Sequence, residues 1–364
     1  MKILILNSIL YTAEKNKIPR VDSIKDKMIF NLSMGFVNAG HQVTLIAASE
    51  YRPATEEVYP FEVLFFPSFL PCLFSPALLP LHPRLISYLR KHKESFDLII
   101  SSEIFSFNSL FASLIAPRKT IIWSELGQHN RKFHKIPSYL WYHVVARLLM
   151  RRSLVVPRSR RAGKFAGKFG LKVYDGFITH GANSYRLREN KIKKNHLVVV
   201  GQLIPRKNIF SILEKYVAFV RKHPTPHYKL YLIGDGPMRK EIETFISANK
   251  LEDRIYLTGN LSHDELGEIL SSAQCMLCDS LQELCMIAPE ESIFTATPVI
   301  TNTIPYNSDW MNEHRLGIVK DGWNEDDIYE IISNNTFYVD NCSRYAPLLS
   351  QESIAGQFLK CIKF

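Results

Sequence analysis

Short apolar runs alternate with longer amphipathic segments along the chain, and this alternation predicts strands followed by helices. The first apolar run, 3–6, precedes a helix expected over 21–38 and a second strand expected over 41–47. A strand, a helix and a strand in this order imply a parallel sheet, and such sheets bind ligands at the carboxyl ends of their strands. We therefore expect a ligand near the loop 7–20, which has no glycine and so lacks a dinucleotide fingerprint.

Two further buried strands are expected in the first half of the chain, over 96–100 and 120–123. Their carboxyl ends should lie at the same edge of the sheet as the first loop. Glu125 and His129 follow the second of these strands and are our candidates for catalysis in this half. A purely structural role for each remains open.

The second half repeats the alternation. Strands are expected over 196–200, 229–233 and 254–257, and helices over 209–222 and 238–249. We place the domain boundary near Tyr185, before the polar stretch that opens this half. The sequence therefore predicts an α/β protein with two Rossmann-like domains.

The loops after these strands carry groups that suit a phosphate. Arg206 and Lys207 lie between a strand and a helix start, where two cations can hold a diphosphate. Gly234 and Gly236 fit a turn in which the backbone must approach another group closely, and Pro237 would open the next helix. Each signal is weak alone, but all lie at successive strand ends.

A pair of glutamates, Glu283 and Glu291, brackets an expected helix start at Pro289. Carboxylates accept hydrogen bonds from sugar hydroxyls, and the free N–H groups of a helix start suit an anion. A nucleotide-sugar presents both groups. The alternative is a solvated acidic helix start.

Composition narrows the picture further. The 364 residues are 46% hydrophobic and 22% charged, which is typical of a globular protein of two domains. The net charge of +10 attracts anionic partners. Cys275 and Cys278 have the spacing of a metal pair, but no second pair follows, so we expect buried strand residues. Scattered free thiols suit a reducing cytosol, and no run of 18 apolar residues predicts a membrane span.

Two segments remain ambiguous. The segment 63–83 is rich in Phe and Leu but holds five prolines, which exclude a regular helix. It is either a packed connection or an apolar surface for a membrane or a lipid-linked substrate. The segment 147–172 carries nine basic residues and no acidic one. Nucleic acid is not the expected partner, because no recognition motif accompanies the charges. The segment is either a surface that an anionic membrane attracts or a basic face exposed to solvent.

Four stretches carry a resemblance to a known family: VVVGQLIPRKN (198–208), LYLIGDGPMRKEIE (230–243), RIYLTGNLSHDEL (254–266) and ELCMIAPEESIFTATPVI (283–300). In order and spacing they resemble the C-terminal domain of family 4 retaining glycosyltransferases. The resemblance implies the GT-B fold, in which two Rossmann-like domains face each other across a cleft. It places domains at 1–185 and 186–345, with a last helix in 346–364 packed back on the first.

The resemblance also implies roles for individual residues. Glu291 resembles the glutamate that holds the ribose hydroxyls of the donor, Glu283 the one near the donor sugar, and Lys207 the lysine on the diphosphate. Leu261 stands where the family's main chain meets the base. Met286 and Ile287 stand where backbone amides meet the sugar and the phosphate. Other expected donor-binding residues are Gln202, Arg206 and Gly234.

The chain departs from the family pattern at several positions. Gln202 replaces an arginine, Leu284-Cys285-Met286 replaces a glycine-rich turn, and Ser102 and Glu125 stand where the family has histidines. These departures leave open a catalytically degenerate nucleotide-sugar-binding protein. A nucleotide-sugar epimerase of the same fold is another alternative.

The resemblance thus implies a retaining, metal-independent glycosyltransferase of the hexosyltransferase type, with no cofactor. Its catalytic candidates are Glu283, Glu125 and His129. The expected partners are a nucleotide-sugar donor and a saccharide or lipid-linked acceptor, such as a precursor of a surface polysaccharide. We expect a cytoplasmic protein that touches the inner face of an anionic membrane.

Overall fold

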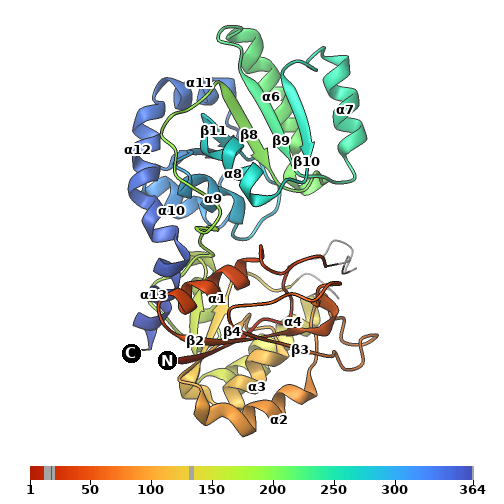
Figure 1. Ribbon diagram of the computed structural model, residues 1–364, viewed down its shortest axis with the longest axis vertical. Coiled ribbons are helices and arrows are strands. Elements are labelled where there is room, and N and C mark those ends of the chain that lie inside the picture. The colour runs from red at the N-terminus through yellow and green to blue at the C-terminus, as the bar shows by residue number, and fades with distance from the viewer. Residues whose placement is uncertain (12–17, 19–20, 131–134, 363–364) are drawn as a thin grey trace. The chain divides into compact units, whose positions relative to one another are not determined.

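The computed structural model describes residues 1–11, 18, 21–130 and 135–362, and it divides into two compact units (Figure 1). Unit 1 comprises Met1–His180 and Gln351–Phe364, and unit 2 comprises Gly181–Ser350. The change of unit falls after His180, five residues before the position expected from the polar stretch. Part of the expected ligand loop 7–20 lies outside the described residues.

Unit 1 is built on a parallel sheet of seven strands in the order β3-β2-β1-β4-β5-β6-β7. The central strands are apolar on both faces because helices cover both faces of a parallel sheet. The strands are β1 (Lys2–Leu6), β2 (Gln42–Ala48), β3 (Glu62–Phe66), β4 (Leu98–Ser102), β5 (Thr120–Ser124), β6 (Leu154–Pro157) and β7 (Lys172–Val173).

Alternate residues of β1 show which helices cover which face. Ile3 and Ile5 pack with α1 (Met28–Asn38) and α13 (Gln351–Cys361). Leu4 and Leu6 point the other way and pack with α2 (Pro83–His92) and α3 (Phe107–Ile115). That second face continues under η6 (Trp141–Met150), which is the π-helical continuation of α4 (Ile136–Leu140), and under α5 (Arg160–Gly167).

The first helix begins seven residues later than the sequence predicts, at Met28 instead of residue 21. The carboxylate of Glu57 accounts for the difference, because it accepts hydrogen bonds from the Ser23 hydroxyl at 2.7 Å and from the Ile24 N–H at 3.3 Å. Lys27 is still extended, and the helix starts after it. A contact 34 residues away in the sequence therefore sets this boundary.

The last helix, α13, packs against α1 within unit 1. The approach is close at Gly35, where a Cβ atom would lie 2.4 Å from the carbonyl oxygen of Gln351. Phe358 of α13 contacts Phe36 at 6.2 Å and Trp123 at 5.3 Å between ring centroids. These aromatic contacts join the end of the chain to the core of the first sheet.

Unit 2 is built on a parallel sheet of six strands in the order β10-β9-β8-β11-β12-β13. Two predicted strands and the helix 209–222 are confirmed to the residue. The strands are β8 (His196–Val200), β9 (Lys229–Ile233), β10 (Ile255–Gly259), β11 (Cys275–Leu277), β12 (Val299–Thr301) and β13 (Gly317–Val319). The helices are α6 (Ile209–Lys222), α7 (Arg239–Ala248), α8 (His263–Ser271), α9 (Ile287–Phe294), α10 (Ser308–Glu313), α11 (Glu325–Ser333) and α12 (Asn335–Tyr345).

Short 3-10 helices occur in both units. Those of unit 1 are η2 (Ser49–Tyr51), η3 (Lys93–Ser95) and η4 (Pro117–Lys119), and those of unit 2 are η7 (Pro205–Lys207) and η8 (Ala346–Leu349).

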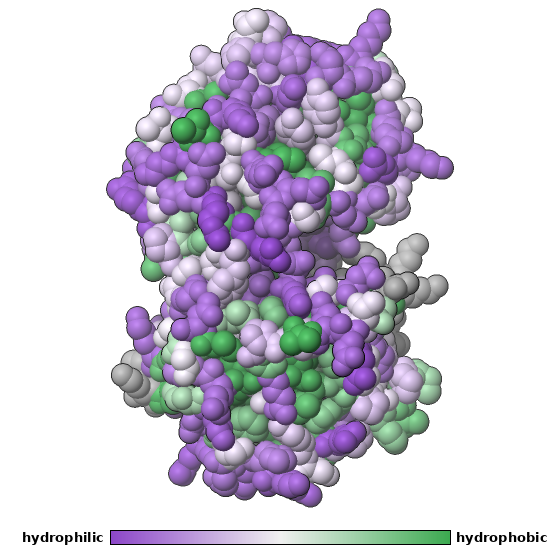
Figure 2. Space-filling model, viewed as in Figure 1, coloured by the Kyte–Doolittle hydropathy of each residue, from purple (hydrophilic) through white to green (hydrophobic). Residues whose placement is uncertain are grey.

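Several sequence interpretations concern the surface and the thiols. Cys275, in β11, and Cys278, directly after that strand, are both buried as expected. Among the described residues the structure shows no cluster of three or more metal-ligating side chains. No helix lies between Pro67 and His82, as the prolines predict. The visible face of unit 1 gathers hydrophobic side chains, whereas that of unit 2 is mostly hydrophilic (Figure 2). Within the described ranges no helix is long and apolar enough to cross a membrane.

Candidate functional site

The strand order of unit 2 defines where a ligand is expected. From β8 the chain winds to β9 and β10 on one side, and then to β11, β12 and β13 on the other. Ligands of open α/β sheets bind where the winding reverses, which here is between β8 and β11. The loop after β8 carries Gln202, Arg206 and Lys207, and the segment after β11 carries Glu283 and Met286. The predicted residues of these two loops therefore lie at the switch point.

Glu283 forms an ion cluster with two cations of the neighbouring loop. Its Oε1 lies 2.7 Å from the Nζ of Lys207 and also accepts a hydrogen bond from the Nη1 of Arg206. The side chains of Glu283 and Lys207 are largely buried, and Arg206 is partly exposed. Two positive charges against one negative charge leave the cluster with a net charge of +1, which favours an additional anion.

The two loops are brought together by glycines. Gly234 has a φ of +131°, and a Cβ atom there would lie 2.1 Å from the carbonyl oxygen of Gly201. A Cβ atom on Gly236 would lie 2.4 Å from the carbonyl oxygen of Leu203. The prediction of a close backbone approach is therefore confirmed, and the group approached is the loop after β8. Without these glycines the Lys207 loop could not lie where it does.

Helix α9 starts at Ile287, so the expectation of a start at Pro289 is wrong by two residues. Met286 is the N-cap and carries no side-chain cap. Instead, Asn307 fixes its backbone: the Asn307 Nδ2 donates to the Met286 carbonyl at 2.8 Å, and the Met286 N–H donates to the Asn307 Oδ1 at 3.4 Å. The N–H groups of Ile287 and Ala288 belong to the first turn, which has no intrahelical acceptors for them, and are suited to an anion.

The adjacent glutamates of α9 have different environments. Glu290 is fully buried, and its Oε2 accepts a hydrogen bond from the Gly181 N–H at 2.8 Å. It thus ties α9 to the first residue of unit 2. Glu291 is also buried, but its Oε1 lies 3.5 Å from the Nε2 of His263 at the start of α8. His263 is a neighbour of the predicted site that the sequence did not single out.

Asp279 anchors the segment that leads from β11 to the glutamates. Its Oδ2 lies 2.6 Å from the Nζ of Lys215 and accepts a hydrogen bond from the Ser211 hydroxyl at 2.7 Å. Its Oδ1 accepts from the Nδ2 of Asn302 at 3.1 Å. Lys215 lies 4.0 Å from the ring centroid of Trp323, whose indole donates to the Cys278 carbonyl. These buried contacts hold the base of the loop, and sequence reasoning missed them because their members lie far apart in the chain.

The remaining donor-binding candidates lie on the loops of the same sheet. Gln202 is exposed directly after β8. Leu261 lies between β10 and α8 and is partly buried. The next residue, Ser262, caps α8 through a reciprocal pair of hydrogen bonds with Glu265. The cap fixes the backbone beside Leu261, which is the backbone expected to meet a base.

In unit 1 the carboxyl ends of three neighbouring strands bring together a second polar cluster. Glu103 follows β4, Glu125 follows β5 and Arg158 follows β6. The Nη1 of Arg158 lies 3.3 Å from the Oε2 of Glu125 and donates to the Nε2 of His180 at 2.8 Å. The guanidinium also lies over the Trp123 ring, 4.0 Å from its centroid. Of these residues, only Glu125 was a sequence candidate for the site.

Glu103 is the most strained member of this cluster. Its φ is +66°, in the left-handed region that non-glycine residues rarely adopt. Its carboxylate accepts from the Glu125 N–H at 2.9 Å and from the Ser124 hydroxyl at 3.1 Å. Burial raises its pKa, and the charge of Arg158 opposes that rise. Strain and a raised pKa in a group at a strand end are frequent at functional sites.

His129 does not join this cluster. Aromatic rings enclose its imidazole, with Phe165 at 5.1 Å, Tyr139 at 5.4 Å and Tyr142 at 5.5 Å between centroids. Burial lowers its pKa, and so does nearby His143. Glu125 therefore lies among charged side chains, whereas His129 lies among aromatic side chains.

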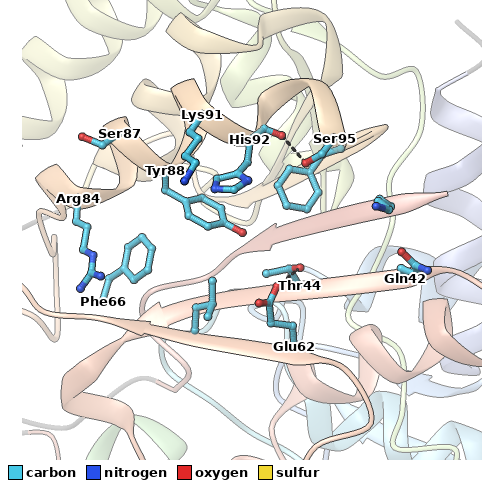
Figure 3. A pocket seen from close by; sticks show the side chains of 13 residues that line it. Gln42, Thr44, Glu62, Phe66, Arg84, Ser87, Tyr88, Lys91, His92 and Ser95 are labelled. Atoms are coloured by element: carbon cyan, nitrogen blue, oxygen red, sulfur yellow. Dashed lines mark hydrogen bonds between the residues drawn. The ribbon is translucent and has the colours of Figure 1, made fainter.

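A separate cavity of about 710 Å³ lies on the second face of the unit 1 sheet. Lys2, Gln42 and Glu62, the first residues of β1, β2 and β3, line its floor, and α2 contributes Tyr88 and Lys91 (Figure 3). The cavity thus runs along the edge strand β3, from Glu62 to Phe66, and reaches the amino ends of β1 and β2. Glu103, Glu125 and Arg158 do not line it.

Comparison with known proteins concerns mainly the second half of the chain. Residues 185–334 match the family described as glycosyl transferases group 1. The O-antigen chain mannosyltransferase RfbU of Salmonella typhimurium is 26% identical over 129 residues, which are 35% of this chain and 35% of that protein. The match therefore spans about a third of the length of this curated relative.

The solved structures that resemble the whole chain include the following two. Sucrose-phosphate synthase from Thermosynechococcus elongatus has a TM-score of 0.70 at 14% identity, over 100% of this chain and 98% of that chain. The Anabaena protein Alr3699/HepE in complex with UDP has a TM-score of 0.68 at 14% identity, over 100% of both chains. At such identities the likeness shows the fold alone.

Proposed function

We propose that this chain, whose residues 185–334 form a glycosyl transferases group 1 domain on a GT-B fold, transfers a sugar from a nucleoside diphosphate sugar to a hydroxyl acceptor with retention of configuration. The observation that carries the proposal is the pair of carboxylates, the largely buried Glu283 and the buried Glu291, on either side of the start of α9, which has no side-chain cap. Lys207 lies against the first of them. This arrangement offers cations and N–H groups to a diphosphate and a carboxylate to sugar hydroxyls.

The donor would be held by complementary groups of unit 2. Lys207, Arg206 and the first N–H groups of α9 would bind the diphosphate and stabilise the charge that develops on it as the glycosidic bond breaks. Glu291 would accept hydrogen bonds from the ribose hydroxyls, and the backbone near Leu261 would meet the base. In this scheme protein cations neutralise the leaving group, and no metal ion is required.

Retention follows from the family resemblance, which implies attack from the face that the leaving group occupies. The acceptor oxygen forms its bond to the anomeric carbon as the bond to the diphosphate breaks, and the leaving phosphate takes the acceptor's proton. Glu283 would lie near the donor sugar and hold Lys207 and Arg206 in place. We do not assign it the role of a covalent nucleophile.

The acceptor would be bound by unit 1, where Glu125 and Arg158 offer groups that pair with saccharide hydroxyls or with a phosphate. The relative RfbU is named as an O-antigen chain mannosyltransferase, which supports a saccharide precursor of a surface polysaccharide as the acceptor class. A lipid-linked acceptor would bring the protein to the cytoplasmic face of an anionic membrane. The basic segment 147–172 supports that location.

Calorimetric titration with UDP and GDP tests the donor site. We expect one nucleotide to bind at micromolar concentration and Glu291→Ala to weaken it at least tenfold, or about 1.4 kcal/mol. Glu268→Ala is the matched control, because Glu268 is exposed on the neighbouring helix α8 and should leave the affinity unchanged. Binding without transfer or hydrolysis of any donor sugar would favour the degenerate binding protein, and absence of binding to either nucleotide would contradict the proposed donor site.

A further inference from the structure

The helix that follows the aromatic cluster of unit 1 has an unusual outer face. This helix runs from Ile136 to Met150, as α4 and its continuation η6. Trp141, Tyr142 and Ala146 point inward and are buried in the core beneath it. The opposite face should be polar in a helix that only covers a sheet.

The outer face is instead apolar. Ile136 is 60% exposed and Leu148 is 63% exposed. Six large hydrophobic side chains form what we call the apolar ridge, and each is adjacent to the next or three to four residues from it: Ile136, Tyr139, Leu140, Val144, Leu148 and Leu149. A single exposed leucine needs no explanation, but a contiguous row on one helix marks a surface that is covered in function.

A second set of exposed apolar residues lies on the same side of the sheet. The proline-rich segment is linked to the ridge helix through Phe107 of α3, whose ring makes edge-to-face contacts with Phe74 and with Trp141, each at 5.3 Å between centroids. Beside Phe74, the side chain of Leu73 is 70% exposed and that of Leu70 is 46% exposed. Unit 1 therefore exposes apolar side chains outside the ridge as well.

The charge beside the ridge is of one sign. Arg147, Arg151 and Arg152 are exposed on and directly after the ridge helix. Between residues 104 and 174 the chain holds 14 Lys and Arg residues and a single acidic residue, Glu125. That acid already contacts Arg158. The exposed charges on and directly after the ridge helix are therefore positive.

We propose that the apolar ridge is the surface on which the protein docks to an anionic lipid leaflet. The proposal rests on the proposed function, which brings unit 1 to a membrane, and it names the element that touches the lipid. The ridge helix would lie along the leaflet, with the leucines at the boundary of headgroups and acyl chains and the arginines on lipid phosphates. A helix of 15 residues is too short to span the bilayer, so it lies in the interface.

A second copy of the chain is a poorer occupant of the ridge. In a symmetric dimer the same patch meets itself, so the arginines beside the ridge would face the arginines of the other copy. Like charges brought together at an interface weaken association. An anionic leaflet satisfies both the apolar and the basic parts of the surface.

The apolar part is tested by co-sedimentation with vesicles of phosphatidylcholine that contain phosphatidylglycerol. We expect the double substitution Leu140→Gln and Leu148→Gln to lower the partition coefficient at least tenfold. The control, Ile192→Gln with Phe337→Gln, removes two exposed apolar side chains from unit 2 and should change partition less than twofold. Equal losses in both variants, or no vesicle binding by the wild-type protein, would overturn the proposal.

The basic part is tested in the same assay. Arg147→Gln, Arg151→Gln and Arg152→Gln together should lower binding to the anionic vesicles on the order of a hundredfold, because each basic residue near an anionic surface adds roughly fivefold. These substitutions should leave the weak binding to pure phosphatidylcholine unchanged. The control removes the same number of charges from unit 2 through the substitutions Lys194→Gln, Lys240→Gln and Lys250→Gln.

Two further measurements separate the possible failures. Sedimentation velocity of the wild type and of the Leu140→Gln, Leu148→Gln variant detects self-association. If the wild type is a dimer that these substitutions dissociate, and if it does not bind vesicles, the membrane assignment is overturned. Affinity for the nucleotide is measured on the same variants. If the wild type binds the nucleotide but the ridge substitutions do not change vesicle binding, this inference alone is refuted. If the wild type does not bind the nucleotide, the proposed function is refuted.

Discussion

Replacement of Lys207 by methionine tests the electrostatic reasoning at the switch point of unit 2. Methionine keeps an unbranched apolar chain of similar length beside Gly201 and removes the charge. The Nζ of Lys207 lies 2.7 Å from Glu283, and the lysine side chain is 15% exposed, so solvent screens its charge only partly. The variant leaves Glu283 paired with Arg206.

The size of the effect follows from the interaction that is removed. A hydrogen bond to a charged group in a partly buried site contributes about 1.5–3 kcal/mol. At 1.4 kcal/mol for each factor of ten, the nucleoside diphosphate should bind about 10- to 150-fold more weakly to Lys207→Met. The corresponding nucleoside has no phosphate, so its weaker binding should not change.

Calorimetry with the preferred nucleoside diphosphate, and competition with its nucleoside, measure both affinities. Lys240→Met on the exposed face of α7 is the matched control, and a thermal melt of each variant shows that it is folded. An equal loss for diphosphate and nucleoside would mean that the substitution distorts the site as a whole. No loss for the diphosphate would refute the role of Lys207 as its cation.

Two predictions concern stability. Gly35→Ala should destabilise unit 1 by about 1–3 kcal/mol, because the added Cβ would lie 2.4 Å from the Gln351 carbonyl oxygen, and urea unfolding measures this loss. The control is Gly356→Ala, whose added Cβ meets nothing within 4 Å and should leave the stability unchanged or raise it. Burial lowers the pKa of Lys193 from 10.5 to about 7. The unfolded chain then binds more protons than the folded chain between these values, so stability should rise as the pH increases from 7 towards 10. Lys193→Met, which removes the hydrogen bonds to the Ser271 carbonyl and to the Thr297 hydroxyl, should flatten this rise. An identical pH profile in both proteins would contradict the pKa assignment.

The strands and helices that the sequence predicted in the first part of unit 2 were predictable because local signals set their boundaries. The strand 196–200 and the helix 209–222 have an apolar pattern of the right period, and both were predicted to the residue. The start of α1 was not predictable, because the carboxylate of Glu57 captures Ser23 and Ile24 across a long stretch of chain. The start of α9 was misplaced because Pro289 suggested a first helical position, whereas Asn307 fixes the backbone of Met286 two residues earlier.

The sequence by itself determined that two α/β halves exist and that a pair of carboxylates and a pair of cations follow their strands. Those features depend on local periodicity and on residue type. Only the tertiary structure decided which of the groups meet: Glu283 contacts Lys207, and Glu125 joins Arg158 while His129 does not. The same holds for the apolar ridge. Which face of its helix stays uncovered depends on packing against distant strands, and no local pattern encodes that.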